Sequence, residues 1–264
     1  MTLGSFPDGS MLIKQPLPER GKVTVSWFYE EDRELIGLIY LTRHLQSHGF
    51  RDLELYMPYI PNARQDRVKT GEDVFTLKWS AELINGLGFS KVRVLDPHSS
   101  VSEALIDRIE VESPKPYIEQ VIGLLRDRTG EMPAMFYPDE GAGKRYGGMI
   151  PLPYAFGIKR RDWKTGQIRG LDVAGAVEDI TGKTVLIVDD ICSRGGTFYH
   201  SAKKLLELGA KEVYLFITHC EDTVLEGELL TSGLIRQIFT TDSILTAEHE
   251  MITKIHLERS DIHG

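Results

Sequence analysis

The sequence predicts an α/β fold of two tandem units, each a parallel β-sheet flanked by helices. Three observations predict this class. Short apolar segments alternate along the chain with segments of helical periodicity. Polar residues follow directly after several apolar segments, as is typical where parallel strands end. The alternation breaks once, near residues 108–117 at Ser113 and Pro114, so we expect units at 1–112 and 113–264.

In the first unit, strands and helices are expected in turn. Apolar, β-branched and aromatic residues predict strands at residues 22–28, 53–60 and 91–98. Apolar residues near helical spacing predict a first helix at 31–50: Leu35, Ile36, Ile39, Leu41 and Leu45. A second helix, at 76–89, is closed by Gly86 and Gly88.

The same alternation resumes in the second unit. Helices are expected at residues 117–128 and 198–210. Strands are expected at residues 134–141, 184–190, 212–220 and 235–244. Strands that are short, apolar and separated by helices indicate parallel sheets with both faces covered.

Composition narrows the class of function. The 31 Lys and Arg against 39 Asp and Glu give a formal net charge of −8, which argues against a nucleic-acid binder driven by bulk charge. The two cysteines, Cys192 and Cys220, are too few for a disulfide framework and are expected as reduced thiols, which suits the cytoplasm. The sequence has neither a recognisable signal peptide nor an apolar run long enough to span a bilayer.

One stretch, TVLIVDDICSRGGTF (184–198), contains several residues that could bind a ligand. A buried strand runs into Asp189 and Asp190, and a glycine loop then leads to a helix. Backbone N–H groups of such a loop can cradle a phosphate, and carboxylates can accept hydrogen bonds from sugar hydroxyls. The alternative is a tight turn that only caps the helix. The aspartate pair directly before the loop favours a site for a phosphorylated sugar.

Two other predicted strands end in similar residues. Asp96 and His98 follow the strand at 91–98, and Asp139 follows the strand at 134–141. Ligands bind at the carboxyl ends of strands in open parallel sheets, and carboxylate oxygens suit Mg²⁺. Such carboxylates can hold Mg²⁺ or accept hydrogen bonds from sugar hydroxyls. A histidine alone is more often structural, but His98 lies beside Asp96 and Asp139 ends another strand, which favours a metal site.

The segment VLIVDDICSRGGT resembles the phosphoribosyl-pyrophosphate (PRPP) motif of type I phosphoribosyltransferases and of ribose-phosphate pyrophosphokinase. Six further segments resemble the latter family, in the right order and over nearly the whole chain: FPDGS (6–10), PYIPNARQDR (58–67), VLDPHS (94–99), YPDEGAGKR (137–145), IKRRDWKTGQI (158–168) and ITH (217–219). The resemblance implies two phosphoribosyltransferase-like (Rossmann-like) units, with ATP on the first and ribose phosphate on the second.

The resemblance also implies an activity, transfer of the β,γ-diphosphate of ATP to the C1 hydroxyl of ribose 5-phosphate with Mg²⁺. It implies ATP-binding residues, with Asp66 orienting the arginines: Phe6, Asp8, Arg64, Gln65, Asp66, Arg67 and His98. It implies metal sites at His98 and Asp139, and cations of a mobile catalytic loop at Lys159 and Arg161. It implies a ribose-phosphate site: Asp189, Asp190, Ser193, Arg194, Gly195, Gly196 and Thr197. Phe6 and Asp8 match a loop that reaches a neighbouring subunit's ATP, which implies a homo-oligomer.

The chain departs from the family pattern in several places. The family usually has a strand and a helix before FPDG and a closing helix after the segment KIHLERS, so we expect a trimmed first unit. Ser10 stands where the family commonly has a glutamate.

Arg194 replaces the usual threonine of the phosphate loop. A guanidinium brings five donors and a full charge, which favours an acceptor with a second phosphate, such as ADP-ribose in NAD metabolism. Alternatively, Arg194 points outward and pairs with an acid such as Glu221 or Asp222.

Two other functions compete with the diphosphokinase. A phosphoribosyltransferase that consumes PRPP and a base needs no ATP site, and the ARQDR and IKRR segments argue against it. A non-catalytic regulator of a pyrophosphokinase predicts lost metal or loop residues, whereas His98, Asp139, Lys159 and Arg161 are present. The KRRDWK segment could also be an ordinary solvated run of charges.

Overall fold

The structure is a computed structural model that describes residues 2–19, 21–161, 168–259 and 262–263, with side chains described for 4–19, 21–158 and 170–259. The chain divides into two compact units. Unit 1 contains Met1–Ser113 and Leu257–Gly264, and unit 2 contains Pro114–His256. The C-terminal segment, which the sequence pattern assigns to the second unit, therefore groups with the first.

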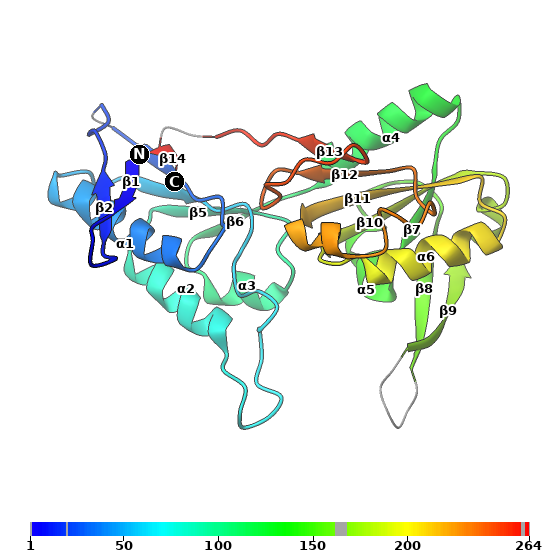
Figure 1. Ribbon diagram of the computed structural model, residues 1–264, viewed down its shortest axis with the longest axis horizontal. Helices are drawn as coiled ribbons and strands as arrows, with labels where there is room; N and C mark the ends of the chain where they lie inside the picture. Colours follow the sequence, from blue (N-terminus) through cyan, green and yellow to red (C-terminus); the bar gives the residue numbers. More distant parts are fainter. Residues whose placement is uncertain (1, 20, 162–167, 260–261, 264) are drawn as a thin grey trace. The chain divides into compact units, whose positions relative to one another are not determined.

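Unit 1 contains a five-stranded parallel sheet with the strand order β14-β3-β4-β5-β6 (Figure 1). Its strands are β3 (Val23–Ser26), β4 (Leu53–Tyr56), β5 (Lys91–Leu95), β6 (Ile109–Glu112) and β14 (Ile262–His263). Its helices are α1 (Arg33–Ser47), α2 (Thr76–Gly86) and α3 (Ser100–Leu105). An antiparallel hairpin, β1 (Thr2–Ser5) and β2 (Met11–Lys14), precedes the sheet.

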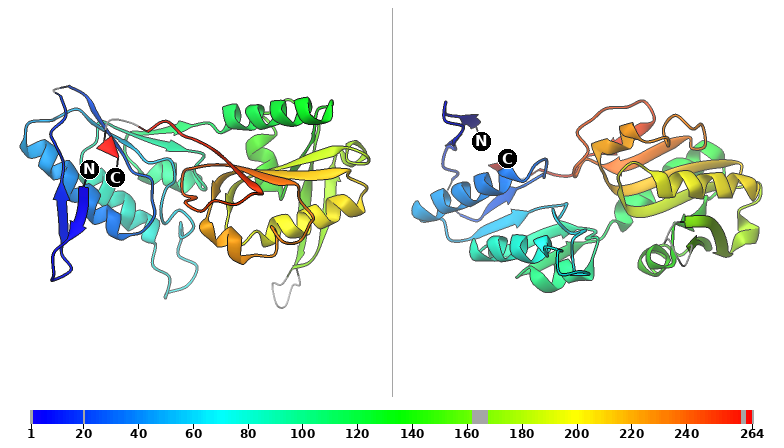
Figure 2. Two further views of the ribbon diagram at one scale, coloured as in Figure 1. Left: turned by 45° about the horizontal axis from the view of Figure 1, so that its top comes forward. Right: turned by 60° about the horizontal axis from the view of Figure 1, so that its bottom comes forward.

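Helices α1 and α2 cover one face of the unit 1 sheet (Figure 2). Leu41 and Leu45 of α1 and Ile84 of α2 pack with alternate strand residues such as Leu55 and Val94 in one hydrophobic cluster. The spacing of these apolar residues explains why the segments fold as helices, because it places them on the side facing the sheet.

Unit 2 contains a seven-stranded sheet with the strand order β13-β12-β11-β10-β7-β8-β9 (Figure 1). Its strands are β7 (Ala134–Tyr137), β8 (Tyr154–Arg161), β9 (Ile168–Gly175), β10 (Thr184–Cys192), β11 (Glu212–Cys220), β12 (Gln237–Thr241) and β13 (Ile252–Ile255). Only the β8–β9 pairing is antiparallel within this sheet. Its helices are α4 (Lys115–Thr129), α5 (Glu140–Tyr146) and α6 (Gly196–Glu207), with 3₁₀ turns η1 (Val177–Asp179) and η2 (Asp222–Glu226).

The central strand β10 is buried on both faces. Val185 and Ile187 belong to one hydrophobic cluster, with residues of α6. Leu186 and Val188 belong to a second cluster, with residues of α4 and α5. This explains why residues 184–188 are continuously apolar rather than alternating.

These observations confirm the α/β class with parallel sheets and flanking helices. The sequence reasoning did not identify several elements that the structure contains: the β1–β2 hairpin, α3, β6, α5, the β8–β9 hairpin, β13 and β14. No helix within the described residues is both long and apolar enough to cross a membrane.

Candidate functional site

Residues 193–197, the loop predicted to bind a phosphate and called the phosphate loop below, follow β10 and lead into α6. Gly195 has a left-handed backbone (φ 77°) and precedes the first helical residue, Gly196. A Cβ on Gly195 would also lie 2.7 Å from Cδ2 of Leu229. Glycine is therefore needed twice over at this position. The first N–H groups of a helix have no partner within it, so the loop presents donors and the positive end of the α6 dipole.

A segment after β11 supports this loop from behind. A Cβ on Gly227 would lie only 1.9 Å from the carbonyl oxygen of Arg194. Leu229 is fully buried, and the backbone N–H of Glu221 donates to the carbonyl of Cys192 (2.8 Å). The conformation of the loop is thus set by close packing. Sequence reasoning missed these contacts, although the pairing of neighbouring parallel strands predicts that the segments after β10 and β11 meet.

Asp189 and Asp190 lie near the carboxyl end of β10, which continues to Cys192, and their side chains are on opposite faces. Asp190 follows Val188 in the alternation, and its buried carboxylate accepts a hydrogen bond from Nη1 of Arg145 on α5 (2.6 Å). Burial and the charges of Asp190 and Asp139 raise the pKa of Asp189 well above its usual range. The three aspartates therefore concentrate negative charge at this edge of the sheet.

Asp139 is held at the start of α5. Its carboxylate caps the helix by accepting from the backbone N–H of Ala142 (3.1 Å). A Cβ on Gly141 would lie 3.2 Å from Oδ1 of Asp139. The YPDEG segment thus fixes this carboxylate beside the Asp189–Asp190 pair.

Arg194 forms an ion pair with Glu226. Its Nη2 and Nε atoms both donate to Oε2 of Glu226, at 2.8 Å and 3.2 Å, and both side chains are exposed. The sequence analysis expected Glu221 or Asp222 as an acidic partner of Arg194. The structure gives Glu226 as this partner instead. Asp222 instead accepts hydrogen bonds from Thr246, including its backbone N–H (2.9 Å).

In unit 1, the ARQDR loop follows β4 and is anchored by Asp66. The buried carboxylate of Asp66 accepts from Nε and Nη2 of Arg67, at 2.7 Å and 2.9 Å. It also accepts from the hydroxyl of Ser99 (2.7 Å), which starts α3 next to His98. These hydrogen bonds lower the pKa of Asp66 far below its usual range. They join the ends of β4 and β5, so Arg67 and His98 lie at the same edge of the sheet.

The other residues of this loop differ in their attachment. The side chain of Gln65 accepts a hydrogen bond from the hydroxyl of Thr76 at the start of α2 (2.9 Å). Arg64, Gln65, Arg67 and His98 are all exposed. Unit 1 therefore presents cationic and polar side chains at the carboxyl ends of β4 and β5.

Phe6 and Asp8 form the tip of the β1–β2 hairpin. Asp8 accepts from the backbone N–H and the hydroxyl of Ser10, at 2.9 Å and 2.6 Å, and these bonds lower its pKa. Gly9 has φ 82°, which closes the turn. Phe6 is 50% exposed. Ser10, the departure from the family's glutamate, thus stabilises the tip that carries both predicted residues.

Lys159 and Arg161 lie on β8, where they pair with β9 opposite Leu171 and Ile168. The rest of the basic segment, residues 162–167, and the side chains of Lys159 and Arg161 lie outside the described part of the chain.

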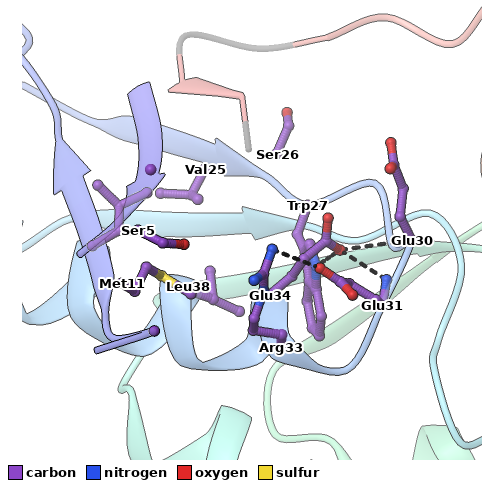
Figure 3. Close-up of a pocket in the computed structure, with 14 residues that line it drawn as sticks. Ser5, Met11, Val25, Ser26, Trp27, Glu30, Glu31, Arg33, Glu34 and Leu38 are labelled. Atoms are coloured by element: carbon purple, nitrogen blue, oxygen red, sulfur yellow. Dashed lines mark hydrogen bonds and ion pairs between the residues drawn. The ribbon is translucent and has the colours of Figure 1, made fainter. Parts of the chain in front are cut away.

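A cavity of about 290 Å³ opens between the β1–β2 hairpin, the end of β3 and α1 (Figure 3). Met11 and Leu38 line it together with Glu30 and Glu34. The carboxylate of Glu34 accepts from Nε1 of Trp27 (3.1 Å) and the backbone N–H of Glu30 (2.9 Å), so it organises the turn before α1. None of the predicted site residues lines this cavity.

Comparisons with known proteins identify a family and a fold that this chain shares. A family model described as the phosphoribosyl transferase domain matches residues 145–240. The ribose-phosphate pyrophosphokinase of Pyrococcus abyssi is 31% identical over 250 residues, which cover 91% of this chain and 83% of that protein. The ribose-phosphate pyrophosphokinase of Thermococcus kodakarensis is 33% identical over 222 residues, with coverage of 81% and 75%.

A solved structure shares the fold. The crystal structure of phosphoribosylpyrophosphate synthetase from Mycobacterium smegmatis matches with a TM-score of 0.78 and 21% identity. The match covers 97% of this chain and 85% of that one.

Proposed function

The chain belongs to the ribose-phosphate pyrophosphokinase family, a family of transferases, and from this premise we propose that it transfers the β,γ-diphosphate of ATP to the C1 hydroxyl of ribose 5-phosphate. The observation that carries the proposal is the phosphate loop of unit 2. A left-handed glycine, a helix N-terminus and a preceding pair of aspartates are what a sugar phosphate requires.

The ribose 5-phosphate would be held from both ends. Backbone N–H groups and hydroxyls of Ser193–Thr197 would bind the 5-phosphate. Asp189 and Asp190 would accept hydrogen bonds from the ribose hydroxyls, which requires that their carboxylates be deprotonated and fixed in place. The support for this assignment is that the contact of Arg145 with Asp190 and the packing of Gly227 on the loop hold these groups in position.

ATP would bind to unit 1. Arg64, Gln65 and Arg67 would contact the nucleotide and its phosphates, and Asp66 would hold Arg67 in place. Phe6 and Asp8 would reach the adenine of a neighbouring subunit's ATP, so we also propose a homo-oligomer. The exposed position of Phe6 at the hairpin tip supports this role.

Mg²⁺ fits the residues of unit 2. This ion prefers oxygen ligands, keeps several waters and needs only one or two carboxylates beside substrate phosphates. Asp139 and Asp189 would supply them. The pKa of Asp189 is raised first by burial and then by the charges of Asp190 and Asp139, and a cation would offset the second of these causes. Among the described residues, no group of three or more His, Cys, Asp or Glu side chains could hold a metal ion by itself. A magnesium-binding role is proposed separately for His98 of unit 1. When bound, the ion neutralises charge on the transferring diphosphate.

Lys159 and Arg161 are proposed to stabilise the charge that develops during transfer. Diphosphoryl transfer depends on positioning and electrostatic stabilisation more than on covalent chemistry by the protein. Two cations at the end of a strand could supply this stabilisation.

A 5′-extended acceptor such as ADP-ribose extends the proposal, and Arg194 motivates it. A second phosphate at the loop would have to displace Glu226 from the guanidinium. Because both side chains are exposed, this exchange costs little.

The proposed reaction is tested by incubating the protein with ATP, Mg²⁺ and either ribose 5-phosphate or ADP-ribose. Mass spectrometry should detect AMP and an acceptor that has gained a diphosphate. Formation of ADP would indicate a simple kinase, and the absence of any ATP-dependent product would contradict the proposal.

A further inference from the structure

Arg145 ends the YPDEGAGKR segment and has no role among the residues that the sequence analysis singled out. It lies in the last turn of α5, and its half-buried guanidinium reaches across to β10. Sequence reasoning drew only Asp139 from this segment. Both ends of the segment act on the aspartate pair of β10. The charge of Asp139 helps to raise the pKa of Asp189, and the guanidinium of Arg145 donates a hydrogen bond to Asp190.

The contact fixes both oxygens of one carboxylate. Oδ2 of Asp190 accepts from Nη1 of Arg145 at 2.6 Å, and Oδ1 accepts from the backbone N–H of Ile191 at 2.8 Å. One donor comes from the helix and the other from the strand, so the plane of the carboxylate is set by two separate elements. A charged hydrogen bond of this length is among the stronger contacts that a protein makes.

The strand alternation explains why only one of the two aspartates receives this partner. Asp190 shares its face with Val188, which packs in the cluster that contains α5. Asp189 shares its face with Ile187, on the side of α6. Two consecutive carboxylates are thereby given different environments, one paired with a cation and one surrounded by negative charge.

We propose that Arg145 is a positioning residue that holds the Asp190 carboxylate in the orientation required to accept the ribose hydroxyls. The inference rests on the proposed function. A carboxylate has about four acceptor sites, so it can be held by protein donors and still accept from a substrate hydroxyl. Without Arg145, the carboxylate of Asp190 would lose the donor that α5 supplies to Oδ2 while keeping the backbone N–H of Ile191 on Oδ1, so its plane would no longer be set from two elements.

The test compares Arg145→Met, Arg145→Lys and Lys144→Met in the full-length protein. Lys144 is the matched control, because it lies on the same helix and forms only an exposed ion pair with Glu140. We expect Arg145→Met to lower kcat/KM for ribose 5-phosphate by about tenfold to hundredfold, with the KM for ATP nearly unchanged. Arg145→Lys should recover part of the loss, and Lys144→Met should behave like the wild type.

A second measurement tests the ion pair without turnover. A double-mutant cycle in urea unfolding, with Arg145→Met and Asp190→Asn singly and together, should give a coupling of about tenfold in the unfolding equilibrium constant. Absence of coupling overturns the inference whatever the activities are. The inference is also overturned if coupling is found but Arg145→Met leaves the kinetics unchanged, or lowers kcat/KM equally for ATP and ribose 5-phosphate. In either case the contact is a structural one.

The two proposals fail in distinguishable ways. If the wild type forms no AMP, the proposed function fails and the role of Arg145 in the reaction fails with it, whereas the unfolding cycle still reports the ion pair. If the wild type is active and the Arg145 variants have the same kinetics as the Lys144→Met control, the proposed function stands and only the inference about Arg145 fails.

Discussion

Asp66 shows how one buried side chain organises a loop. Its carboxylate binds Arg67 within the loop and Ser99 beyond the next strand, so a single residue joins the ends of β4 and β5. The sequence predicted that Asp66 orients arginine. It could not predict the contact with Ser99, because that contact spans 33 residues and depends on the order of the strands.

Asp66→Asn should destabilise unit 1 by roughly 1–2 kcal/mol at neutral pH, because charged hydrogen bonds are lost. The pKa of Asp66 is lower in the folded than in the unfolded protein, so the stabilisation is complete above the unfolded value near pH 4 and is lost as the pH falls further. Thermal unfolding from pH 7 to pH 2.5 should show the difference between wild type and variant narrowing at acid pH. A difference independent of pH, or an equal effect of the exposed Asp107→Asn, would contradict this role.

Arg194→Thr should weaken the use of ADP-ribose more than the use of ribose 5-phosphate. A charge-assisted hydrogen bond to a second phosphate contributes about 1.5–3 kcal/mol, or roughly tenfold to hundredfold in affinity. The measurement is kcat/KM for ADP-ribose and for ribose 5-phosphate, in the wild type and in Arg194→Thr. Glu226→Gln, which frees the guanidinium, should favour ADP-ribose. Equal losses for the two acceptors, or a wild type that ignores ADP-ribose, would restrict the protein to ribose 5-phosphate.

At the scale of elements, the phosphate loop depends on the segment after β11. Leu229 fills the space that a side chain at position 195 would take, and Gly227 lies against the backbone of Arg194. The loop itself could be predicted because strand, aspartates and glycines are contiguous in sequence. The contacts that support the loop could not be predicted. Gly227 belongs to no recognisable sequence pattern, and a glycine is needed there because of Arg194, 33 residues earlier in the chain.

Gly227→Ala should raise the KM for ribose 5-phosphate by about tenfold or more, because an added Cβ would overlap the carbonyl of Arg194 and displace the loop. The backbone at Gly227 has φ −93°, which alanine adopts readily, so the effect is one of space alone. Gly148→Ala is the control, since a Cβ there meets nothing within 4 Å. Steady-state kinetics with similar KM values for the two variants would refute the supporting role of Gly227.

The β8–β9 hairpin is the element that the sequence indicated least well. Its strands carry Gly157, Gly170 and Gly175 and a run of cations, which read as a loop rather than as strands. Pairing comes from tertiary context, because β8 extends the sheet beside β7. The basic residues therefore stand on a strand and at its end.

Lys159→Ala should lower kcat by about a hundredfold or more with little change in the KM for ATP. A cation that acts where charge develops stabilises the transition state more than the bound substrate. Steady-state kinetics over a range of ATP concentrations measure both constants. A normal kcat would identify KRRDWK as a solvated run of charges.

At the scale of the whole molecule, the proposed chemistry is divided between two units. The residues proposed to bind the nucleotide belong to unit 1, and those proposed to bind ribose phosphate belong to unit 2. The repeated alternation of strands and helices predicted the two units, and the family resemblance implied ATP on the first unit and ribose phosphate on the second. The sequence did not predict that residues 257–264 belong with unit 1, because β14 is two residues long and has no periodicity to detect.

The central claim is that a diphosphate moves as one group, and isotope labelling of ATP tests it most directly. ATP labelled in the β-phosphate and, separately, in the γ-phosphate is incubated with the protein, Mg²⁺ and ribose 5-phosphate, and the products are separated. We predict that both labels appear in the C1-diphosphorylated sugar and that the AMP, formed in equal amount, carries neither. A β-label retained in ADP, with only the γ-label on the sugar, would contradict diphosphate transfer.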